Sequence, residues 1–389
     1  MKCKLSDICA FRKGKVSVSN LTLKTYISTE NMLPNKGGIT KASSLPTVEL
    51  TQKYKKGDVL VSNIRPYFKK IWQAKCDGGC SNDVLVFQGN SNIDRDFLYY
   101  VLANDDFFAY SMATSKGTKM PRGDKTSIMQ YEVPVFDVDT QRRIASILRC
   151  LDEKIELNNA INNNLEQQYI SIVDNLLSKL TQYKIYSLLE VADCQNGRAF
   201  YKEGYDPNGA FVIDLGNVNT SGNFVRTAAD KYISLDRYKE PKLEKYRVYK
   251  NDIVMVMTDR KSTMELLGKV GKIYKDGYYL LNQRMYRIRA KKGINTNYLY
   301  ACLNSTETSN FLKRKALGSV QKYVNTGEIN SIEIKVPSSE KMEEIASILD
   351  PIFSQMESNI LENESLNELR DILLPKLMSG ELDVSDIDL

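Results

Sequence analysis

The chain has 389 residues, of which 42% are hydrophobic and 26% charged, proportions typical of a globular protein with two or three domains. It contains no histidine, which excludes Ser-His-Asp and Cys-His catalytic arrangements and removes the commonest metal ligand. No apolar run is long enough to span a membrane, the first residues do not resemble a signal peptide, and the seven cysteines are scattered. We therefore expect a cytoplasmic protein with reduced thiols and no membrane partner.

The net charge of +6 is distributed unevenly. Residues 1–139 hold 20 Lys and Arg against 14 Asp and Glu, and residues 184–339 hold 26 against 16. Residues 140–183 hold 5 of each sign, whereas residues 340–389 hold 3 basic and 13 acidic residues. Two basic modules thus alternate with a neutral and an acidic segment, which indicates a polyanionic partner for the modules and a different contact for the acidic segment.

The first basic module, residues 1–139, is predicted to have a mixed α/β fold. Aliphatic runs bounded by Gly, Asn and Pro predict strands at 58–62 and 83–87. Apolar residues at helical spacing predict one helix over 94–111.

The second basic module, residues 184–339, repeats this order of elements. Strands are predicted at 252–257 and 282–289, and one helix from about 296 to 315. The two modules therefore share one predicted fold.

An internal repeat supports this comparison. The string IASIL occurs at Ile144–Leu148 and again at Ile345–Leu349, an offset of 201 residues that also aligns Gly117 with Gly318. These matches indicate that the chain contains two copies of one unit of about 200 residues. A duplicated binding module suggests a target with two parts.

Each module is followed by a predicted helix of about 40 residues, within residues 140–183 and 340–389. Apolar residues recur along both helices at spacings of three and four, as in a coiled coil. Pro375 and Gly380 are predicted to end the second helix, about one turn shorter than the first.

Asparagines in the two predicted seams define the expected pairing. They are Asn158 and Asn162 in the first helix and Asn359 and Asn363 in the second. If the helices pack antiparallel within one chain, facing residues have numbers that sum to 521, so Asn158 meets Asn363 and Asn162 meets Asn359. A slipped register would place an Asn against an apolar residue without a hydrogen-bond partner. The alternative is a surface helix whose asparagines face solvent.

Motifs for catalysis and metal binding are absent or incomplete. The chain has neither a G-x-x-x-x-G-K-[ST] phosphate loop nor a G-x-G-x-x-G turn. Asp206-Pro-Asn-Gly209 lacks the second proline and the aromatic residue of an amino-methyltransferase motif, and Cys76 and Cys80 lack the further ligands of a zinc site. We therefore expect a non-catalytic chain that itself binds no cofactor and no metal.

Short runs in both modules combine the basic, aromatic and amide side chains that bind phosphates and base edges. In the first module the candidate DNA-binding residues are Arg65, Tyr67, Lys69, Lys70, Lys116, Lys119 and Arg122. In the second module they are Arg260, Lys261, Arg284, Gln321, Lys322 and Tyr323. Each run alone is also compatible with a solvated protein surface. Their presence in both basic modules favours nucleic acid.

The chain resembles, over nearly its whole length, a specificity (S) subunit of a Type I restriction–modification system. The resemblance rests on the two-module, two-helix repeat and on four strings: GDVLVSNIRPYF at Gly57–Phe68, GGCSNDVLVF at Gly78–Phe87, QRRIASIL at Gln141–Leu148 and LLPKLMSGELDV at Leu373–Val384. Both copies are present, as in a full-length subunit. The second module departs from the first where Thr258-Asp259-Arg260 stands in place of Ile64-Arg65-Pro66.

Together with the resemblance, these patterns predict an α+β fold with two tandem mixed α/β target recognition domains, 1–139 and 184–339. The two long helices, 140–183 and 340–389, separate these domains and form an antiparallel coiled coil. The resemblance implies that each domain binds half of a bipartite double-stranded DNA site. It also implies that the helices set the spacer and dock two methyltransferase subunits, and that restriction subunits join the complex. S-adenosylmethionine, ATP and Mg²⁺ would then bind the partner subunits. The alternatives are a self-contained nuclease or methyltransferase with divergent motifs, and a scaffold that bridges proteins without sequence preference.

Overall fold

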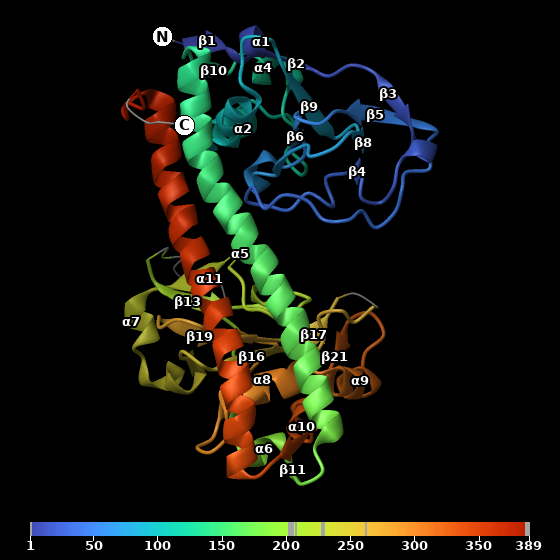
Figure 1. The fold of residues 1–389 in the computed structure, drawn as a ribbon, viewed down its shortest axis with the longest axis vertical. Helices are drawn as coiled ribbons and strands as arrows, with labels where there is room; N and C mark the ends of the chain where they lie inside the picture. Colours follow the sequence, from blue (N-terminus) through green and yellow to red (C-terminus); the bar gives the residue numbers. More distant parts are fainter. Residues whose placement is uncertain (1, 201–205, 207, 227–229, 261–262, 386–389) are drawn as a thin grey trace. The chain divides into compact units, whose positions relative to one another are not determined.

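The computed structural model describes residues 2–200, 206, 208–226, 230–260 and 263–385. Contacts divide the chain into two compact units: unit 1 comprises Met1–Leu157 and Glu362–Leu389, and unit 2 comprises Asn158–Leu361 (Figure 1). Each unit contains one mixed α/β module and part of both long helices, because apolar residues from both helices complete the core of that module. The domain limits expected from the sequence, which separate modules from helices, stay a prediction.

Unit 1 has, among its described residues, two four-stranded sheets with the orders β2-β9-β6-β7 and β3-β5-β8-β4, and the antiparallel pair β1–β10. The strands are β1 (Lys2–Lys4), β2 (Cys9–Phe11), β3 (Lys15–Ser17), β4 (Tyr26–Ile27), β5 (Leu50–Tyr54), β6 (Val59–Ser62), β7 (Ile71–Gln73), β8 (Gly78–Cys80), β9 (Val84–Gly89) and β10 (Glu132–Pro134). The helices of its module are α1 (Leu5–Ile8), η1 (Val18–Asn20), η2 (Pro66–Phe68), α2 (Arg95–Ala103), α3 (Asp105–Ala113) and α4 (Lys125–Ile128).

The first sheet of unit 1 is buried on both faces, which explains the continuous aliphatic runs of β6 and β9. Val59 and Val61 of β6 belong to a core that includes residues of α2, α3 and both long helices. Leu60, between them, belongs to a second core shared with Tyr54 and Cys80 of the other sheet. Alternate residues of a strand face opposite sides, so both sides must be apolar. The strands predicted at 58–62 and 83–87 are confirmed.

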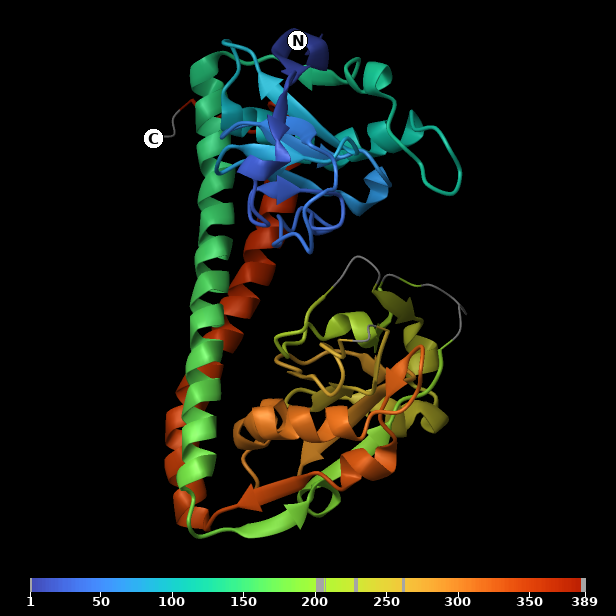
Figure 2. The same cartoon turned by 90° about the vertical axis from the view of Figure 1, so that its right-hand side faces the viewer.

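Unit 2 repeats this plan with sheets β12-β20-β16-β18 and β14-β13-β19-β15 among its described residues. Its strands are β11 (Lys184–Ser187), β12 (Ala192–Asn196), β13 (Ala210–Ile213), β14 (Lys231–Ile233), β15 (Arg247–Val248), β16 (Ile253–Val256), β17 (Thr258–Asp259), β18 (Val270–Lys272), β19 (Tyr279–Leu281), β20 (Met285–Ala290), β21 (Lys322–Tyr323) and β22 (Glu333–Val336). The helices of its module are α6 (Leu188–Val191), η3 (Leu215–Asn217), α7 (Leu235–Tyr238), η4 (Pro241–Tyr246), α8 (Thr296–Asn304), α9 (Thr306–Arg314) and α10 (Thr326–Asn330). Figure 2 shows β11 and β22 as the antiparallel pair that connects the module to the two long helices. The strand predicted at 252–257 is confirmed, and the strand predicted at 282–289 is confirmed in part, because residues 283–284 form a turn and β20 begins at Met285.

The two modules diverge at the edge of the second sheet. In both, a central strand, β8 or β19, pairs in parallel with one neighbour and antiparallel with the other. The fourth strand of unit 1, β3, adds to β5, whereas that of unit 2, β14, adds to β13 at the opposite side of the shared three strands. The repeat therefore holds the inner scaffold constant and varies its edge.

The single helices predicted over 94–111 and 296–315 are wrong, because each is two helices. The chain is extended at Asn104, where ψ is 140°, and at Ser305, where ψ is 157°. Asn104 then accepts the amide of Asp106, and Ser305 accepts the amide of Thr308, so each begins a new helix as its N-cap. A capping side chain outweighs the continuous apolar spacing at these positions.

The long helices are α5 (Val138–Lys179) and α11 (Ser339–Ser379), with 42 and 41 residues. The predicted difference of one turn is wrong, and so is the expectation that Pro375 ends the second helix. Pro375 lies inside α11, where Leu374 and Leu377 are buried in the core of unit 1 and hold the turn in place. The helix ends at Ser379, and Gly380 follows it with a φ of 76°, while Glu381 donates its amide to the Lys376 carbonyl.

Contacts between α5 and α11 confirm the antiparallel pairing. In unit 2, Asn359 Nδ2 donates to Asn162 Oδ1 at 2.8 Å, and these residue numbers sum to 521. The rings of Tyr169 and Phe353 lie 4.9 Å apart between centroids, a sum of 522. Asn359 is only 4% exposed, so the alternative of solvent-facing asparagines is wrong for this pair. The pairing of Asn158 with Asn363, which belong to different units, stays a prediction.

Candidate nucleic-acid interface

In unit 1 a hairpin loop brings most of the candidate residues together. Lys116 and Arg122 exchange backbone hydrogen bonds of 2.9 and 3.0 Å, and between them Gly117 turns the chain with a φ of 91°. Arg65 donates its amide to Pro121 of this loop at 2.8 Å. The loop also carries Lys119, which is exposed. The structure thus joins two candidate runs that are about 50 residues apart in the sequence.

Strained backbone surrounds the short helix η2, which carries Tyr67 with 48% of its surface exposed. Arg65 and Lys69 flank η2 with φ angles of 52° and 50°, in the left-handed region that disfavours residues with a side chain. The neighbouring loop supports them, because Asn35 donates its amide to Phe68 at 2.8 Å. Such strain persists where surrounding structure enforces it and is concentrated at functional sites.

The candidate cations of unit 1 differ in how they are held. Lys69 lies 2.7 Å from Asp105 in a partly exposed ion pair. Burial raises the pKa of Asp105, but hydrogen bonds from Lys69 and Lys36 outweigh this effect, and the pKa is lower than usual. Lys70 donates to the Thr29 carbonyl at 2.6 Å, and burial lowers its pKa. Lys70 therefore supports a loop of the module.

The hairpin loop has its own ion pairs. Lys116 lies 2.6 Å from Asp124, and its hydrogen bond is the main reason that the pKa of Asp124 falls to about 2. Arg122 lies 3.2 Å from Asp83 and keeps about half of its side chain exposed. These carboxylates orient the cations without enclosing them.

Unit 2 has an equivalent hairpin loop at the offset of 201 residues. Leu317 and Tyr323 exchange backbone hydrogen bonds of 2.8 and 3.0 Å, and Gly318 has a φ of 90°. The strand pair β17–β21 places Thr258 opposite Tyr323, as Ile64 lies opposite Arg122 in unit 1. The substitution of Thr258-Asp259 for Ile64-Arg65 thus falls at the same structural position.

A cavity of about 570 Å³ lies beside this second hairpin loop. Three predicted residues, Arg284, Gln321 and Tyr323, line it. Sequence reasoning missed the other lining residues, which are Asn196, Gly197, Met257, Thr258, Gln283, Val324, Asn325 and Thr326. Gln283 precedes Arg284 in a turn between strands, a signal that could have identified it.

Two further predicted residues of unit 2, Arg260 and Lys322, do not line this cavity. Among the described residues, Arg260 is exposed directly after β17, and Lys322 lies opposite Asp259 in the β17–β21 pair. Lys261 falls outside the described residues.

The two loops present different polar groups from the same backbone position. Asn63 donates its amide to Asp83 in unit 1, as Met257 does to Arg284 in unit 2, so residues 83 and 284 correspond. In unit 1 the acidic Asp83 pairs with Arg122. In unit 2 Arg284 Nη1 instead donates to Gln321 Oε1 at 3.0 Å. A shared scaffold therefore carries two chemically distinct surfaces.

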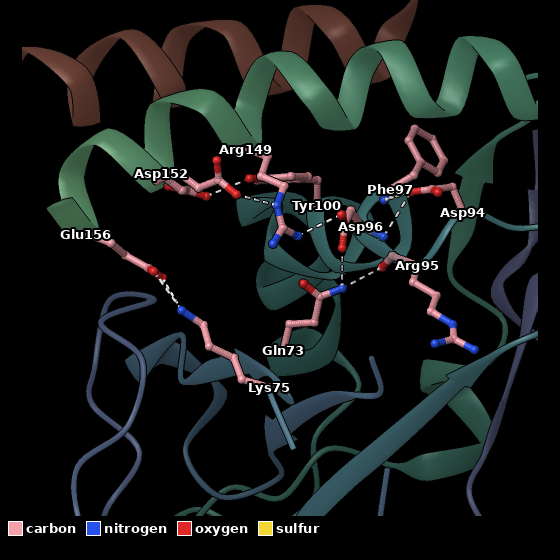
Figure 3. Close-up of polar contacts among 11 residues, drawn as sticks. Gln73, Lys75, Asp94, Arg95, Asp96, Phe97, Tyr100, Arg149, Asp152 and Glu156 are labelled. Atoms are coloured by element: carbon pink, nitrogen blue, oxygen red, sulfur yellow. Dashed lines mark hydrogen bonds and ion pairs between the residues drawn. The ribbon is translucent and has the colours of Figure 1, made fainter. Parts of the chain in front are cut away.

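Within unit 1, polar contacts attach the module to α5 (Figure 3). Arg149 lies 2.7 Å from Asp96, and Tyr100 donates to Asp152 at 2.8 Å. One turn further along α5, Glu156 accepts from Lys75, in the loop between β7 and β8, at 2.6 Å. The module is therefore held to three successive positions of the helix.

In the described part of the chain, the helices include none with the length and hydropathy needed to cross a bilayer. The Cys, Asp and Glu side chains of the same residues form no group of three or more that could hold a metal ion.

A family profile and the sequences of known proteins match both modules of the chain. A profile described as the Type I restriction modification DNA specificity domain matches residues 1–167 and 181–370. The chain is 24% identical to the Type I restriction enzyme HindI specificity subunit of Haemophilus influenzae, over 92% of this chain and 94% of that protein. It is 24% identical to the MjaVIII specificity subunit of Methanocaldococcus jannaschii, over 79% and 75%.

A solved structure shares the fold. The S subunit of a Type I restriction–modification system from M. genitalium superimposes with a TM-score of 0.54 at 17% identity, covering 97% of this chain and 96% of that one. Because the matched segments include well over half of its residues, the chain belongs to the family of Type I restriction–modification DNA specificity domains, the non-catalytic specificity subunits of these systems.

Proposed function

We propose that this chain binds a bipartite double-stranded DNA site, one half with each module, and docks methyltransferase subunits at that site. The difference between the two hairpin loops carries the proposal. In unit 1, Asp83 forms an ion pair with Arg122. At the corresponding position of unit 2, Arg284 donates a hydrogen bond to the side-chain amide of Gln321. Base edges differ in their donors and acceptors, so two loops with different polar groups bind different sequences.

Charge supports the assignment of DNA to the modules and of protein to the long helices. The modules are basic, whereas residues 340–389, which include α11, hold 13 acidic residues against 3 basic ones. Exposed apolar side chains lie along α11 among these acids, including Ile348, Leu369 and Ile372. Apolar surface beside charges that repel DNA fits a protein partner. We assign this surface to two methyltransferase subunits, with restriction subunits joining the complex.

The helices also provide a means of setting the spacer between the two half-sites. A helix of 42 residues is roughly 60 Å long at 1.5 Å per residue. The polar contacts of Figure 3 fix the first module to α5, so helix length would be transmitted to the DNA. S-adenosylmethionine, ATP and Mg²⁺ belong to the partner subunits in this proposal.

Methylome sequencing tests the proposed function. The chain is expressed with its methyltransferase subunit in a host that lacks the system, and the modified motif is determined. We expect two short defined sequences separated by a spacer of fixed length. Replacing residues 117–121 with a Gly-Ser loop should change one half of the motif, and replacing 318–322 should change the other. Methylation without a sequence motif would favour the scaffold alternative. Methyl transfer by the purified chain alone would contradict the proposal.

A further inference from the structure

We propose that the cavity beside the hairpin loop of unit 2 binds a guanine of the half-site contacted by this module, through Arg284 held in position by Gln321. This inference rests on the proposed function and identifies the base that one of its sites selects. Its evidence is the arrangement of donors in the cavity.

The hydrogen bond between Arg284 and Gln321 fixes the orientation of both groups. A guanidinium has only donors, so the amide must turn its oxygen toward Arg284 and its nitrogen away from it. The observed bond joins Arg284 Nη1 to Gln321 Oε1 at 3.0 Å, in agreement with this requirement. With its oxygen turned toward Arg284, Gln321 directs the two donor hydrogens of Nε2 away from the guanidinium.

Two buried polar atoms of the cavity lining have no partner within the described structure. They are Nε2 of Gln321 and Oγ1 of Thr258, and Thr258 is only 7% exposed. Buried polar groups are almost always hydrogen-bonded in folded proteins. Unsatisfied atoms beside a cavity of this size indicate that a polar ligand completes the site.

The backbone at Arg284 is fixed by the module itself, and the hydrogen bond to Gln321 orients the guanidinium. Arg284 has a φ of 71°, in the left-handed region, and its carbonyl accepts the Met257 amide at 3.0 Å. The side chain itself remains exposed at the cavity. An exposed cation on an enforced backbone is preorganised for a directional contact.

The donors select the base. In the major groove guanine presents two acceptors, N7 and O6, whereas adenine presents one acceptor and one donor, and cytosine presents a donor. The remaining guanidinium hydrogens of Arg284 match the two acceptors of guanine. Gln283 and Asn325, which also line the cavity, are the groups that would favour adenine instead.

The experiment compares methylomes of the whole complex containing wild-type chain, Arg284→Lys or Gln321→Met. Lysine keeps the charge but cannot form two parallel hydrogen bonds. We expect Arg284→Lys to reduce the preference for guanine at one position roughly 10- to 100-fold, the discrimination of one bidentate base contact. Gln321→Met, which is similar in size and uncharged, should relax the same position to a smaller extent. The half-site bound by the first module should not change.

Arg314→Lys is the matched control, because Arg314 is exposed on α9 and does not line the cavity. Its motif should equal that of the wild type, and thermal unfolding of all variants shows whether each is folded. If the motif position that loses its base preference in Arg284→Lys carries adenine, cytosine or thymine in the wild-type motif, the assignment of guanine is overturned. A uniform decrease in methylation with an unchanged motif would also overturn it, since it indicates a phosphate contact. A wild-type complex without a bipartite motif would instead refute the proposed function.

Discussion

At the residue scale, the structure separates the candidate cations by what their side chains already contact. Lys70 holds Thr29 inside unit 1 and has a pKa lowered by burial, so its main role is in the fold. Lys119 is exposed at the tip of the loop, whereas Arg65 and Lys69 stand on strained backbone. Side chains that the fold orients but does not enclose are the ones available to DNA.

We expect the double variant Arg65→Gln with Lys69→Gln to weaken DNA binding and to lower its salt dependence. For each phosphate that these side chains no longer neutralise, the slope of log K against log salt should fall by roughly 0.9. Filter binding or fluorescence anisotropy of the complex at several salt concentrations measures the slope. Lys2→Gln with Lys154→Gln removes the same charge from exposed positions of unit 1 and should leave the slope unaltered. An unchanged slope in the first variant would rule out a phosphate role for Arg65 and Lys69.

The charge of Asp124 should stabilise the fold near neutral pH, and this contribution should be lost at low pH. Its pKa is about 2, below the usual 3.8, mainly because of the hydrogen bond from Lys116. A depressed pKa stabilises the fold above pH 3.8, and this contribution disappears as the pH falls through 2. Asp124→Asn keeps the N-cap of α4 but removes the charge, so it should be less stable than wild type at pH 6.

Urea unfolding midpoints between pH 6 and pH 2 test this prediction, and the difference between the two proteins should narrow toward pH 2. Asp276→Asn, at an exposed position of unit 2, is the control and should follow the wild type at every pH. A difference that stays constant with pH would mean that Asp124 stabilises the loop by shape and not by charge.

At the element scale, side-chain hydrogen bonds decide where helices break and how they pair. Asn104 and Ser305 begin new helices where the apolar pattern runs on, while Pro375 fails to interrupt α11. In the seam, Asn162 accepts from Asn359 and donates to the Met356 carbonyl at 3.1 Å. These bonds specify one register at a cost in apolar packing.

The seam asparagines should show strong coupling in a double-mutant cycle. Asn162→Leu removes the acceptor of Asn359 Nδ2 in a buried seam, and we expect the free energy of unfolding to fall by about 1–3 kcal/mol. The double variant Asn162→Leu with Asn359→Leu should recover much of this stability, because two apolar groups then face each other. Chemical denaturation measures all four proteins. Strictly additive effects would show that the two asparagines do not interact.

At the scale of the whole molecule, duplication gives the chain two copies of one module with different loop residues, as the proposed binding of two half-sites requires. The inner sheet, the hairpin loop and the paired helices occur in both copies, whereas the outer strand and the loop residues differ. Each copy needs both long helices to complete its core, since α5 and α11 contribute buried residues to unit 1 and to unit 2. Changes in helix length are therefore tolerated only when both helices change together.

Inserting four residues after Asn159 and another four after Leu361 should lengthen the recognised spacer. One added turn is about 6 Å, which corresponds to roughly one to two base pairs at 3.4 Å each. Methylome sequencing of the complex gives the new spacer. An insertion in α5 alone is the control and should abolish modification, because it disrupts the pairing of the helices. An unaltered spacer in the double insertion would refute the role of the helices in setting it.

Much of the architecture follows from the sequence because its signals are local or repeat at a constant spacing. The aliphatic runs of β6 and β16 predict the strands, and the spacing of apolar residues in the seams predicts the long helices. The offset of 201 residues reveals the duplication. The sum of 521 predicts the contact between Asn162 and Asn359, since an antiparallel pair has a single register that matches polar with polar. Arg284, Gln321 and Tyr323 are identifiable by residue type alone.

The tertiary structure alone decides how these residues combine. The cavity of unit 2 brings Asn196, Thr258, Gln283, Gln321 and Asn325 together from separate loops and strands, and no local pattern links them. The helix breaks at Asn104 and Ser305 are likewise not predictable from local pattern. At each position a capping side chain competes with apolar periodicity, and packing in the folded protein decides that the helix is interrupted. Local propensity and period act between near neighbours in the chain, whereas a binding site depends on contacts among distant segments that form only in the folded protein.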